Sequence, residues 1–536
     1  MSVIEVKLRP GSAEFERRQR AMESRLQEVR DREERVRRNS ARARDRFRQR
    51  GALLPRERLE RLLDRGRAFL ELSSLAGLEM HDDDGDRNAS GGGVIAGLGW
   101  VSGVRCVITA SDSGIKGGST TPMGLKKSLR AQQVALENRL PLVNLIESGG
   151  ANLLYQSEIF VDGGAIFRNL ARLSAAGIPT LSVVHGSSTA GGAYMPGLSD
   201  YVVVVRNRTK IFLAGPPLVK AATGEIADDE ALGGAVMHAE VTGSAEFVAE
   251  DDDHAIQVAR EIMSRLGWAN LERQLAYREP RYEPDELIGV VPEDPKTPYD
   301  VREVIARLVD DSDFLDFKSD YGAAMVCGKA AIEGMTVGVL GNNGPIEADG
   351  AAKAAHFIQL CSQSSSPLIY LQNTTGYMVG LNAEHSGIVK HGSRMIQAVS
   401  NATVPQLTLL IGSSYGAGNY GMCGRAFGPR FIFAWPNNRI AVMGGEQAAG
   451  VMSIITEAKF ERMGQKLDRE ALAAMKKGIV DQIDRESTAL YASARLWDDG
   501  IIDPRHSRRV LATCLRICDE SKRRELQPTS FGIGRV

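Results

Sequence analysis

Short apolar runs recur along both halves of the chain, and each run has the length of one buried β-strand. They lie at Arg105–Ala110, Leu142–Ile146, Thr180–Val184, Tyr201–Val205, Leu368–Leu371, Gln406–Ile411 and Phe431–Ala434. Longer segments with helical patterns separate them, at Met123–Glu137, Gly163–Ala176 and Gly387–Asn401. Because buried strands that alternate with helices form βαβ units, the pattern predicts an α/β fold with mostly parallel strands.

Both ends of the chain also have helical patterns. From Glu14 to Arg67 apolar residues recur every three to four positions in a segment dense in Arg and Glu, which predicts a helical arm. The apolar residues of this arm are Phe15, Met22, Leu26, Val29, Val36 and Phe47. Near the other end, Ile455–Leu496 has a helical pattern with an interruption near Gly478.

Motifs in the first half of the chain return in the second half. LPLVNLIESGG at 140–150 matches SPLIYLQNTTG at 366–376, and HGSSTAGGAY at 185–194 matches IGSSYGAGNY at 411–420. Both pairs are 226 residues apart, since 367 − 141 and 412 − 186 give the same value. Upstream, RLLD and FLEL (61–72) match RLVD and FLDF (307–317) at a spacing of about 245. Three matches in the same order predict two homologous domains of one fold.

A proline-rich segment separates the two repeats. Residues 278–298 contain five prolines and no sustained period, which predicts an interdomain linker. We therefore expect an arm at 1–67 that is part of the N-terminal domain, an N-terminal domain at 68–280, a linker at 281–298 and a C-terminal domain at 299–536. The length of 536 residues agrees with two domains, because single cores stop growing near ~250–300 residues.

Composition excludes several classes of protein. The 66 basic and 67 acidic residues give a net charge of −1, which argues against a chain that binds polyanions over its whole surface. No apolar run approaches the ~18–20 residues of a membrane helix, and the N-terminus lacks the apolar region of a secretory signal. We expect a cytoplasmic protein whose six scattered cysteines are reduced.

Glycine is the residue in excess, with 56 copies, or about 10% against roughly 7% in average proteins. In the two repeated loops a buried strand runs into Gly-Ser-Ser and then into small residues at 189–193 and 415–419. Small residues at a strand-to-helix turn let a ligand approach the backbone, where free N–H groups can donate to a negative oxygen. The loops indicate two oxyanion holes. The alternative is a tight turn with close helix–sheet packing, which two loops at matching positions disfavour.

Other catalytic motifs do not stand out. The sequence has no P-loop, no Rossmann fingerprint, no H-E-x-x-H and no convincing nucleophile elbow. Ser187 and Ser188 follow His185, but neighbouring side chains on a strand point apart, so we expect a core or turn role for these residues. Eight histidines leave little room for a metal cluster, and we expect none.

The motifs resemble those of the carboxyltransferase (β) subunit of biotin-dependent acyl-CoA carboxylases, in the branch with methylcrotonyl-CoA and geranyl-CoA carboxylases. The resemblance covers roughly residues 20–536. It is carried by KGG (116–118), STAGGAY (188–194), FLAGPPLVKAATGE (212–225), QNTTGY (372–377), KHG (390–392), SYGAGNYGM (414–422) and VMGGEQA (442–448). It implies two homologous crotonase-like (ClpP/crotonase, β-β-α spiral) domains with a helical N-terminal arm, in agreement with the repeat.

The resemblance also implies a reaction. Family members take carboxybiotin from a partner's carrier domain and move the carboxyl group to an acyl-CoA. The thioester oxygen and the ureido oxygen of biotin both become negative, and each needs backbone donors in a dry pocket. By resemblance, Gly191 and Gly192 serve the acyl-CoA enolate, and Gly416, Ala417 and Gly418 serve the biotin enolate. The biotin nitrogen acts as the base, which explains why no side-chain acid–base pair stands out.

Further residues are implied to bind the CoA thioester or biotin. They are Lys116, Gly117, Gly118, Ser148, Gly149, Gly163, Ala190, Ala193, Tyr194, Thr375, Gly376 and Tyr420. The implied partner is a biotin carboxylase/biotin carboxyl carrier α subunit, so the biotin is not attached to this chain. The resemblance further implies a hexamer core, within a dodecameric complex, in which each site draws on two chains. It implies no nucleic acid, membrane or metal partner.

Two departures from the family bear on the substrate. Propionyl- and acetyl-type members have an Asp where this chain has Tyr420, which makes small substrates less expected. Methylcrotonyl members tend to have a bulky aromatic residue where this chain has Gly163, and glycine resembles the geranyl type, in which lost side-chain volume admits a longer acyl chain. We expect a branched or medium- to long-chain enoyl-CoA.

Three other interpretations remain open from sequence alone. The same loops would serve a carboxyltransferase that runs in reverse, in a decarboxylase or transcarboxylase. The Arg-rich arm could bind RNA, although a solvated helix with Glu–Arg pairs explains it as well. Ala474–Lys477 resembles a biotin-acceptor sequence, but its helical, charged context argues against biotinylation of Lys476.

Overall fold

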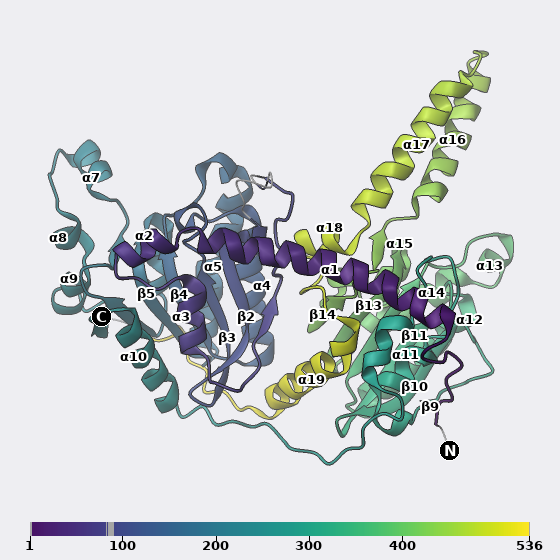
Figure 1. The fold of residues 1–536 in the computed structure, drawn as a ribbon, viewed down its shortest axis with the longest axis horizontal. Coiled ribbons are helices and arrows are strands. Elements are labelled where there is room, and N and C mark those ends of the chain that lie inside the picture. Colours follow the sequence, from purple (N-terminus) through teal and green to yellow (C-terminus); the bar gives the residue numbers. More distant parts are fainter. Residues whose placement is uncertain (1–2, 82, 84–89, 535–536) are drawn as a thin grey trace. The chain divides into compact units, whose positions relative to one another are not determined.

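The computed structural model describes residues 3–81, 83 and 90–534 (Figure 1). These residues form two compact units. Unit 1 takes the residues up to Arg30, Arg273–Ser493 and Trp497–Cys518, and unit 2 takes those in Asp31–Glu272, Ala494–Leu496 and from Asp519 onward. The segment predicted as a linker, 281–298, contains a short 3-10 helix (η5, Pro284–Gly289) and belongs to unit 1.

Unit 2 is built on a mixed sheet with the strand order β1-β2-β3-β4-β5-β6-β8 among its described residues, and β7 also pairs with β5. The strands are β1 (Leu70–Leu72), β2 (Val94–Val101), β3 (Val104–Ser111), β4 (Leu142–Ser148), β5 (Thr180–Thr189), β6 (Tyr201–Val205), β7 (Lys210–Phe212) and β8 (Phe247–Ala249). The first three strands are antiparallel and the rest are parallel. All four strands predicted in this half of the chain are present.

Helices cover the sheet of unit 2. The main ones are α3 (Pro55–Leu62), α4 (Pro122–Asn138), α5 (Gln156–Ala175) and α10 (Asp252–Arg265), and shorter ones are α2 (Arg44–Gln49), α6 (Tyr194–Gly197), α7 (Pro216–Thr223), α8 (Asp229–Gly233) and α9 (Ala235–Glu240). α4 begins where Thr121 Oγ1 accepts the N–H of Gly124 at 3.0 Å and proline follows at the first helical position. Leu62 of α3 and Met263 of α10 join the strand valines in one core, where each buried side chain contributes about 1.5–3 kcal/mol.

Unit 1 repeats this plan with the strand order β14-β13-β12-β11-β10-β9, and β15 also pairs with β13. The strands are β9 (Leu315–Asp316), β10 (Met325–Ile332), β11 (Met335–Asn342), β12 (Leu368–Thr374), β13 (Gln406–Tyr415), β14 (Phe431–Ala434) and β15 (Arg439–Ala441). Its helices up to β15 are α11 (Arg302–Leu308), α12 (Ala348–Gln363), α13 (Leu381–His385), α14 (Ile388–Ser400) and α15 (Gly416–Gly421). The three strands predicted in this half are present, and the fold is the α/β class that the sequence predicts.

Strand pairing confirms the internal repeat. The register between β4 and β5 shifts just before Ser148, which pairs with Ser188. The register between β12 and β13 shifts just before Thr374, which pairs with Ser414. These irregular pairs are again 226 residues apart, since 374 − 148 and 414 − 188 give that value. The two units therefore share a fold, including a shift of strand register at equivalent positions.

A partly buried ion pair is repeated as well. Arg56 of α3 binds Glu71 of β1, with Nη2 2.9 Å from Oε1. Arg302 of α11 binds Asp316 of β9, with Nε 2.9 Å from Oδ2. Each pair fixes the helix that precedes the sheet to the edge strand of its own unit.

The N-terminal arm is helical, as predicted. It forms α1 (Ala13–Ala41), followed by α2 and α3. The apolar residues of the predicted arm are all buried, namely Phe15, Met22, Leu26, Val29, Val36 and Phe47. Exposed positions carry i,i+4 ion pairs such as Arg37–Glu33, at 3.8 Å. This is the arrangement expected of an amphipathic helix laced with Glu–Arg pairs.

The C-terminal helical segment is interrupted at a different place from the one predicted. The helices are α16 (Gly445–Arg462), α17 (Arg469–Glu486), α18 (Ala489–Ala494) and α19 (Ser507–Arg523). α17 runs through Gly478, because one glycine costs an exposed helix only about 1 kcal/mol. The break follows Arg462, where Gly464 has a left-handed φ of 61° and Asp468 caps the next helix.

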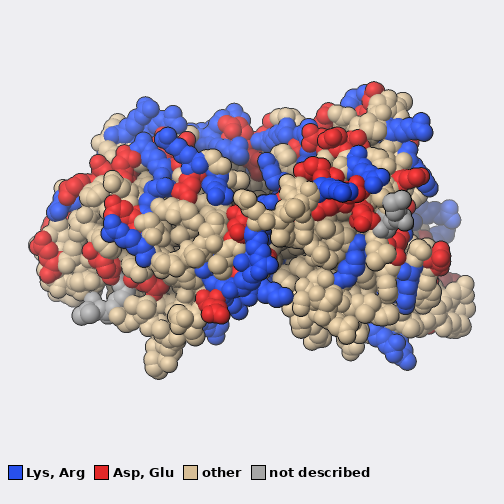
Figure 2. All heavy atoms as spheres, turned by 90° about the horizontal axis from the view of Figure 1, so that it is seen from below, with Lys and Arg blue, Asp and Glu red and all other residues tan. Residues whose placement is uncertain are grey.

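The surface fits the balanced composition. On the face shown in Figure 2, acidic and basic side chains are interspersed, in keeping with the net charge of −1. Within residues 3–81, 83 and 90–534, no helix is long and apolar enough to cross a membrane.

Candidate active site

The first glycine loop follows β5 directly. The strand ends at Thr189, and a 3-10 helix, η4 (Ala190–Ala193), leads into α6. Ala190 has a left-handed φ of 52°, which turns the chain out of the strand. Gly191 and Gly192 then lie in the first turn, where N–H groups have no partner inside the helix. Gly191 is exposed and Gly192 is half-buried, so a ligand can reach this backbone.

Neighbouring side chains shape the space over this loop. Ser188 Oγ donates to the carbonyl oxygen of Gly192 at 2.9 Å. Phe167 of α5 meets Tyr194 edge-on, with ring centroids 5.6 Å apart. A Cβ on Gly191 would lie 3.5 Å from the Phe167 ring. The backbone that could hold an oxyanion is therefore bounded by an aromatic wall.

The loop predicted at 116–118 has an unusual backbone. Lys116, Gly117 and Gly118 have left-handed φ angles of 47°, 64° and 74°. A Cβ on Gly118 would lie 2.2 Å from the carbonyl oxygen of Glu147, so only glycine fits there. A Cβ on Gly117 would meet nothing within 4 Å. Lys116 is exposed at the start of this loop.

The loop that follows β4 lies against both of these loops. Ser148 Oγ donates to the carbonyl oxygen of Gly118 at 3.0 Å. Gly149 is exposed, and a Cβ on Gly150 would lie 3.7 Å from Oγ1 of Thr189. The residues predicted around 116–118, 148–149 and 190–194 are thus brought together where the parallel strands β3, β4 and β5 end.

The face of α5 beside the first loop is open and apolar. A Cβ on Gly163 would meet only Cγ2 of Ile159, at 4.0 Å. Large apolar side chains are exposed in this part of unit 2, namely Leu153, Leu154, Phe160, Val161 and Tyr194. Gly163 therefore leaves space close to the loop for an apolar group of a ligand.

The second glycine loop follows β13 in the same way. Gly416 has a left-handed φ of 54°, as Ala190 has in unit 2, and begins α15. Ala417 is exposed and lies in the first turn, where its N–H has no partner inside the helix. Gly418 is buried, and a Cβ there would lie 2.8 Å from Cα of Gly376. The second loop is thus a second candidate oxyanion hole, with less space beneath it.

The other residues predicted for this site lie around the same loop. Gly376 has a φ of 117°, and its carbonyl oxygen accepts a hydrogen bond from Oγ1 of Thr374 at 3.2 Å. Thr375 between them is exposed. Tyr420 is also exposed, and its ring stacks on Phe427 with centroids 5.8 Å apart.

A hollow of 740 Å³ lies beyond this loop, between the start of α12 and α13. It is lined by aromatic, apolar and acidic side chains, which include Tyr321, Glu347, Met378, Val379, Leu381 and His391. Its lining includes Met378, which comes two residues after Gly376, the residue packed against Gly418. The hollow is therefore a candidate ligand space near the second loop.

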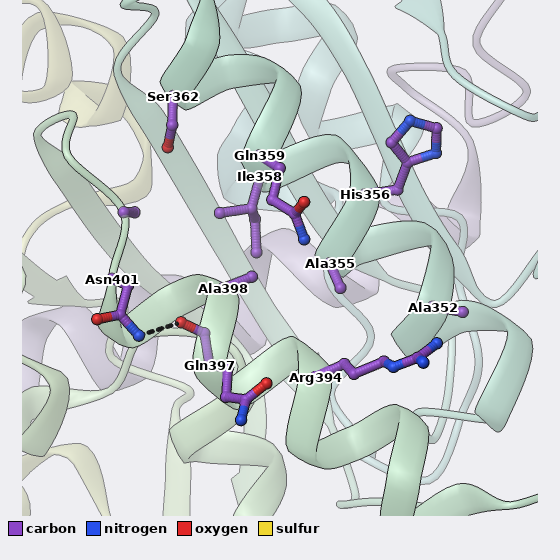
Figure 3. A pocket seen from close by; sticks show the side chains of 11 residues that line it. Ala352, Ala355, His356, Ile358, Gln359, Ser362, Arg394, Gln397, Ala398 and Asn401 are labelled. Atoms are coloured by element: carbon purple, nitrogen blue, oxygen red, sulfur yellow. Dashed lines mark hydrogen bonds between the residues drawn. The ribbon is translucent and has the colours of Figure 1, made fainter.

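A second cavity of 640 Å³ lies between α12 and α14 (Figure 3). Alanines and Ile358 form much of its lining, and Arg394 and Asn401 lie along α14 and just beyond its end. α12 and α14 end just before β12 and β13 begin, so this cavity lies at the opposite edge of the sheet from the glycine loops. It is not part of the candidate site.

A cluster of buried charges beside the first loop was not foreseen from the sequence. Nδ1 of His185 lies 2.7 Å from Oδ1 of Asp252, the first residue of α10. Oδ2 of Asp252 lies 3.3 Å from Nε of Arg58 and 3.2 Å from Nη1 of Arg208. Arg58 in turn binds Oε2 of Glu147 at 2.6 Å. The side chains of His185, Arg58 and Asp252 are at most 2% exposed.

The protonation states in this cluster follow from burial and charge. Burial, together with the charge of Arg58, lowers the pKa of His185, which is therefore neutral. Burial opposes ionisation of Asp252, but the hydrogen bond from His185 and the Arg58 charge hold its pKa well below its usual value. Since the ionised carboxylate only accepts, His185 donates through Nδ1. Its Nε2 has no hydrogen-bond partner within the part of the chain that the structure describes.

The equivalent region of unit 1 is held by neutral groups. Oγ of Ser414 donates to Oε1 of Gln372 at 2.6 Å, and Nδ2 of Asn419 donates to the same Oγ at 2.8 Å. Asn373 stands where unit 2 has Glu147, since 373 − 147 = 226, and its Oδ1 accepts the N–H of Ser413 at 3.1 Å. Two changes within the repeat were signals in the sequence for this difference, Glu147 to Asn373 and His185 to Ile411.

The remaining predictions concern residues outside the loops. His185 is in the core, as expected, and binds Asp252. Lys476 lies within α17, a helix, as expected. The six cysteines are buried, and none of them forms a disulfide. Among the described residues, no group of three or more His, Cys, Asp or Glu could hold a metal ion.

Comparison with known proteins decides the family. A family model described as "Carboxyl transferase domain" matches residues 46–532. The chain belongs to this family. A probable biotin-dependent acyl-coenzyme A carboxylase beta2 subunit of Mycobacterium tuberculosis is 53% identical over 88% of this chain and 88% of its own. A probable methylcrotonoyl-CoA carboxylase beta chain of Drosophila melanogaster is 47% identical over 98% of this chain and 94% of its own.

A solved structure agrees with this assignment. The beta subunit of geranyl-CoA carboxylase from P. aeruginosa is 55% identical, covers 100% of both chains and superposes with a TM-score of 0.94. The predicted family, the two-domain crotonase-like fold and the predicted class of enzyme, an acyl-CoA carboxyltransferase, are confirmed.

Proposed function

We propose that this member of the carboxyl transferase family moves a carboxyl group from carboxybiotin to a branched or medium-chain enoyl-CoA. The observation that carries the proposal is the pair of strand-to-helix loops at equivalent positions, each with accessible backbone at the start of a helix. A transfer that makes two oxygens negative needs two such sites. The sequence of its relatives, named for methylcrotonyl-CoA and geranyl-CoA, supports the class of substrate.

In this proposal unit 2 holds the CoA thioester. The N–H groups of Gly191 and Gly192 donate to the thioester oxygen as the adjacent carbon loses its proton and that oxygen becomes negative. The loops around Lys116–Gly118 and Ser148–Gly149 border the same space and would hold the CoA. Ala193 and Tyr194 continue the helix and close the aromatic side of the pocket.

Unit 1 holds biotin in this proposal. When bound, biotin supplies the carboxyl group and the base. The backbone of Gly416, Ala417 and Gly418 donates to the ureido oxygen, and the hollow next to Gly376 is roomy enough to accept the ring system. Thr375, next to Gly376, and Tyr420, in the same helix as Gly418, are exposed and would help to position the ring. We assign the acyl-CoA domain to residues 68–280 and the biotin domain to 299–536.

The chain acts with partners in this proposal. Biotin arrives on a biotin carboxylase/biotin carboxyl carrier α subunit, and the name of one relative, the beta2 subunit of a biotin-dependent acyl-coenzyme A carboxylase, supports this. We also infer that copies of this chain assemble into a hexamer core, because α16 exposes large apolar side chains in the single chain. These are Val451, Met452, Ile454 and Ile455. Light scattering of the purified chain tests the mass of the assembly.

Substrate choice rests on the space at Gly163. A Cβ there meets only Ile159 at 4.0 Å, so an acyl chain longer than that of 3-methylcrotonyl-CoA can lie against α5. Exposed apolar residues such as Phe160 and Val161 extend along the same helix. These features support a geranyl-like acyl chain over propionyl-CoA.

Turnover by the assembled complex tests the function. The chain is co-purified with its biotinylated partner, and carboxylation of geranyl-CoA, 3-methylcrotonyl-CoA and propionyl-CoA is measured by bicarbonate fixation. We expect the branched enoyl thioesters to exceed propionyl-CoA in kcat/KM by more than about 10-fold. Preference for propionyl-CoA would contradict the substrate assignment, and fixation on none of the three would contradict the function.

A pair of glycine variants sharpens the substrate assignment. Gly163→Phe fills the space beside Ile159 and is expected to lower kcat/KM for geranyl-CoA by about 10–200-fold, with a smaller effect on 3-methylcrotonyl-CoA. Gly164→Phe is the control, because the next helical position points about 100° away. Equal losses for both variants, or an equal loss on both substrates, would contradict the role of Gly163.

A further inference from the structure

The buried charge cluster of unit 2 touches the two strands whose ends carry the acyl loops. Glu147 is the next-to-last residue of β4, and His185 lies in β5, five residues before η4. Arg58 and Asp252 come from α3 and α10, on other parts of the chain. The cluster therefore links two helices to the ends of two adjacent strands.

On the β4 side, Glu147 determines where the neighbouring loops lie. Its carbonyl oxygen occupies the place where a Cβ on Gly118 would be, at 2.2 Å. The next residue, Ser148, binds Gly118 through its side chain at 3.0 Å. A shift of Glu147 would therefore move the loop at 116–118 together with the residues that follow β4. Its carboxylate is fixed by Arg58 at 2.6 Å.

On the β5 side, the same residues support the strand that becomes the oxyanion loop. The Glu147 side chain lies across Gly186, where a Cβ would be 2.9 Å from Cγ. His185 just before it is fixed to Asp252 at 2.7 Å. Six residues beyond His185 the chain reaches Gly191. β5 is therefore held on both sides of its backbone just before the loop.

The charges within the cluster balance. The two carboxylates face the two guanidinium groups, and His185 is neutral. Glu147 is 18% exposed and Arg208 17%, while the other members are almost fully buried. Removing one charge leaves its partner uncompensated in a poorly solvated place, so the remaining groups must move to find new partners.

The cluster belongs to unit 2 alone. At the equivalent positions unit 1 has Asn373 and Ile411, and its loop is held by the amide and hydroxyl network of Gln372, Ser414 and Asn419. A charge placed on only one of two otherwise equivalent loops indicates a demand particular to that loop.

We propose that Glu147 and His185 are positioning residues for the acyl-CoA oxyanion loop. Through Arg58 and Asp252 they fix the ends of β4 and β5 so that the Gly191 and Gly192 N–H groups point to one place. Neither residue needs to touch the substrate. The inference rests on the proposed function, since it assigns the purpose of the loop, but its structural part is independent of any activity.

The test is Glu147→Gln, which keeps the shape of the side chain and removes its charge. In the assembled complex we expect kcat for 3-methylcrotonyl-CoA or geranyl-CoA to fall on the order of 10–100-fold, because small displacements at a reacting centre have effects of that size. Because the loop at 116–118 moves with Glu147, KM for the CoA thioester should rise as well, but by a smaller factor than kcat falls. Hydrogen exchange of the peptide 187–195 should become faster, and that of 411–421 should not.

The matched control is Asp64→Asn. Asp64 is also 18% exposed, binds Arg260 at 2.8 Å and accepts the N–H of Ser102, at the hairpin between β2 and β3. This is the opposite edge of the sheet from the acyl loops. Asp64→Asn is expected to lower Tm in the same way as Glu147→Gln, with kcat and the exchange of 187–195 unchanged.

A second pair covers the case in which Glu147→Gln does not fold. Asn in place of His185 keeps a donor near the Nδ1 position, whereas Leu removes it. We expect His185→Asn to retain most of the activity that His185→Leu loses. Equal activities in this pair, wild-type kcat in Glu147→Gln or an equal loss of kcat in Asp64→Asn would overturn the proposal.

The outcomes separate this inference from the proposed function. If the wild-type complex carboxylates none of the CoA thioesters, the function fails, and hydrogen exchange alone decides the inference. Faster exchange of 187–195 in Glu147→Gln than in Asp64→Asn would then support it. Equal exchange in the two variants would overturn it.

Discussion

The two units hold the same loop in different ways. In both, a residue with a φ near 53° turns the chain out of a strand, Ala190 at 52° in unit 2 and Gly416 at 54° in unit 1. In unit 2 buried ions fix the strands beneath the loop, and in unit 1 the loop rests on Gly376 and on neutral amides. The backbone geometry of an oxyanion site is thus kept while its support is free to differ.

The difference is also visible in where each unit needs glycine. Gly118 in unit 2 is pressed against the carbonyl oxygen of Glu147, whereas Gly344, its equivalent 226 residues later, has nothing within 4 Å. At the strand-to-helix loops it is unit 1, and not unit 2, that has the close contact. Gly418 is pressed against Gly376, whereas Gly192 would place a Cβ 3.6 Å from Ser188, an ordinary contact. Each unit has one tight glycine and one loose one, at opposite positions.

The largest effect is expected at Gly118. Gly118→Ala combines a left-handed φ of 74° with a Cβ only 2.2 Å from a backbone oxygen, so the free energy of unfolding should fall by more than about 3 kcal/mol. Gly344→Ala should change it by less than about 1 kcal/mol. Denaturant titration of both variants measures the difference. Similar losses would mean that the two loops are equally constrained.

At the strand-to-helix loops the expected effect is smaller, and here the variant in unit 1 should lose more stability than the variant in unit 2. Gly418→Ala should lower the free energy of unfolding by about 1–3 kcal/mol and reduce turnover, because Gly376 must move. Gly192→Ala should stay within about 1 kcal/mol of wild type. The same titration, followed by kcat of the assembled complex, checks both. A greater loss of stability in Gly192→Ala would contradict the assigned packing.

The two units should also respond to pH in opposite directions. Burial raises the pKa of Asp498 in unit 1 from 3.8 to about 7. Its stabilising contribution is therefore full below pH 3.8 and is lost as the pH rises through 7. Asp498→Asn should raise Tm at pH 8, by the equivalent of about 1 kcal/mol or more, and change it less at pH 5. Calorimetry at the two pH values measures this, and equal shifts at both would contradict it.

The sign is reversed for His185 in unit 2. Burial and the Arg58 charge lower the pKa of His185. Near pH 6 this imidazole is therefore partly protonated in the unfolded chain and neutral in the folded chain. The contribution of His185 to the free energy of unfolding is therefore fully present above pH 6.5 and decreases as the pH falls below 6.5. The loss of Tm between pH 7.5 and 5.5 should be smaller in His185→Asn than in wild type. An equal or larger loss would show that this imidazole does not carry the effect.

The smallest effect is expected at Ala190. This residue bears the left-handed φ that glycine bears in unit 1, so Ala190→Gly removes strain and should raise the free energy of unfolding by about 0.5–1 kcal/mol. Urea titration resolves a change of this size. A decrease would mean that the Ala190 methyl contributes packing that outweighs the strain.

Much of this scaffold could be predicted from sequence because its signals are local. Buried apolar runs such as Leu142–Ile146 and Gln406–Ile411 clearly predict strands. Because each motif occurs in both halves of the chain, the repeat showed that these matches were not due to chance. β2 was missed because glycines interrupt its apolar pattern, and α12 because its many alanines give weak periodicity. The break after Arg462 was misplaced because a single glycine in a helix is tolerated.

The charge cluster could not be predicted in the same way. Arg58 and Asp252 are separated by 194 residues, and no local sequence pattern indicates that they are in contact. Each is an ordinary charged residue in a helix until the fold brings Arg58 beside Glu147 and Asp252 beside His185. Long-range pairs of this kind require the tertiary structure, and only the changes from Glu147 to Asn373 and from His185 to Ile411 between the repeats indicated a difference.

The most direct test of the central claim is a crystal structure of the assembled complex with a CoA thioester and biotin bound. We expect the thioester oxygen about 2.7–3.1 Å from the backbone nitrogens of Gly191 and Gly192, and the ureido oxygen at the same distance from those of Ala417 and Gly418. A thioester oxygen bound at the Ala417 loop, or both oxygens bound at one loop, would contradict the division of labour between the two units.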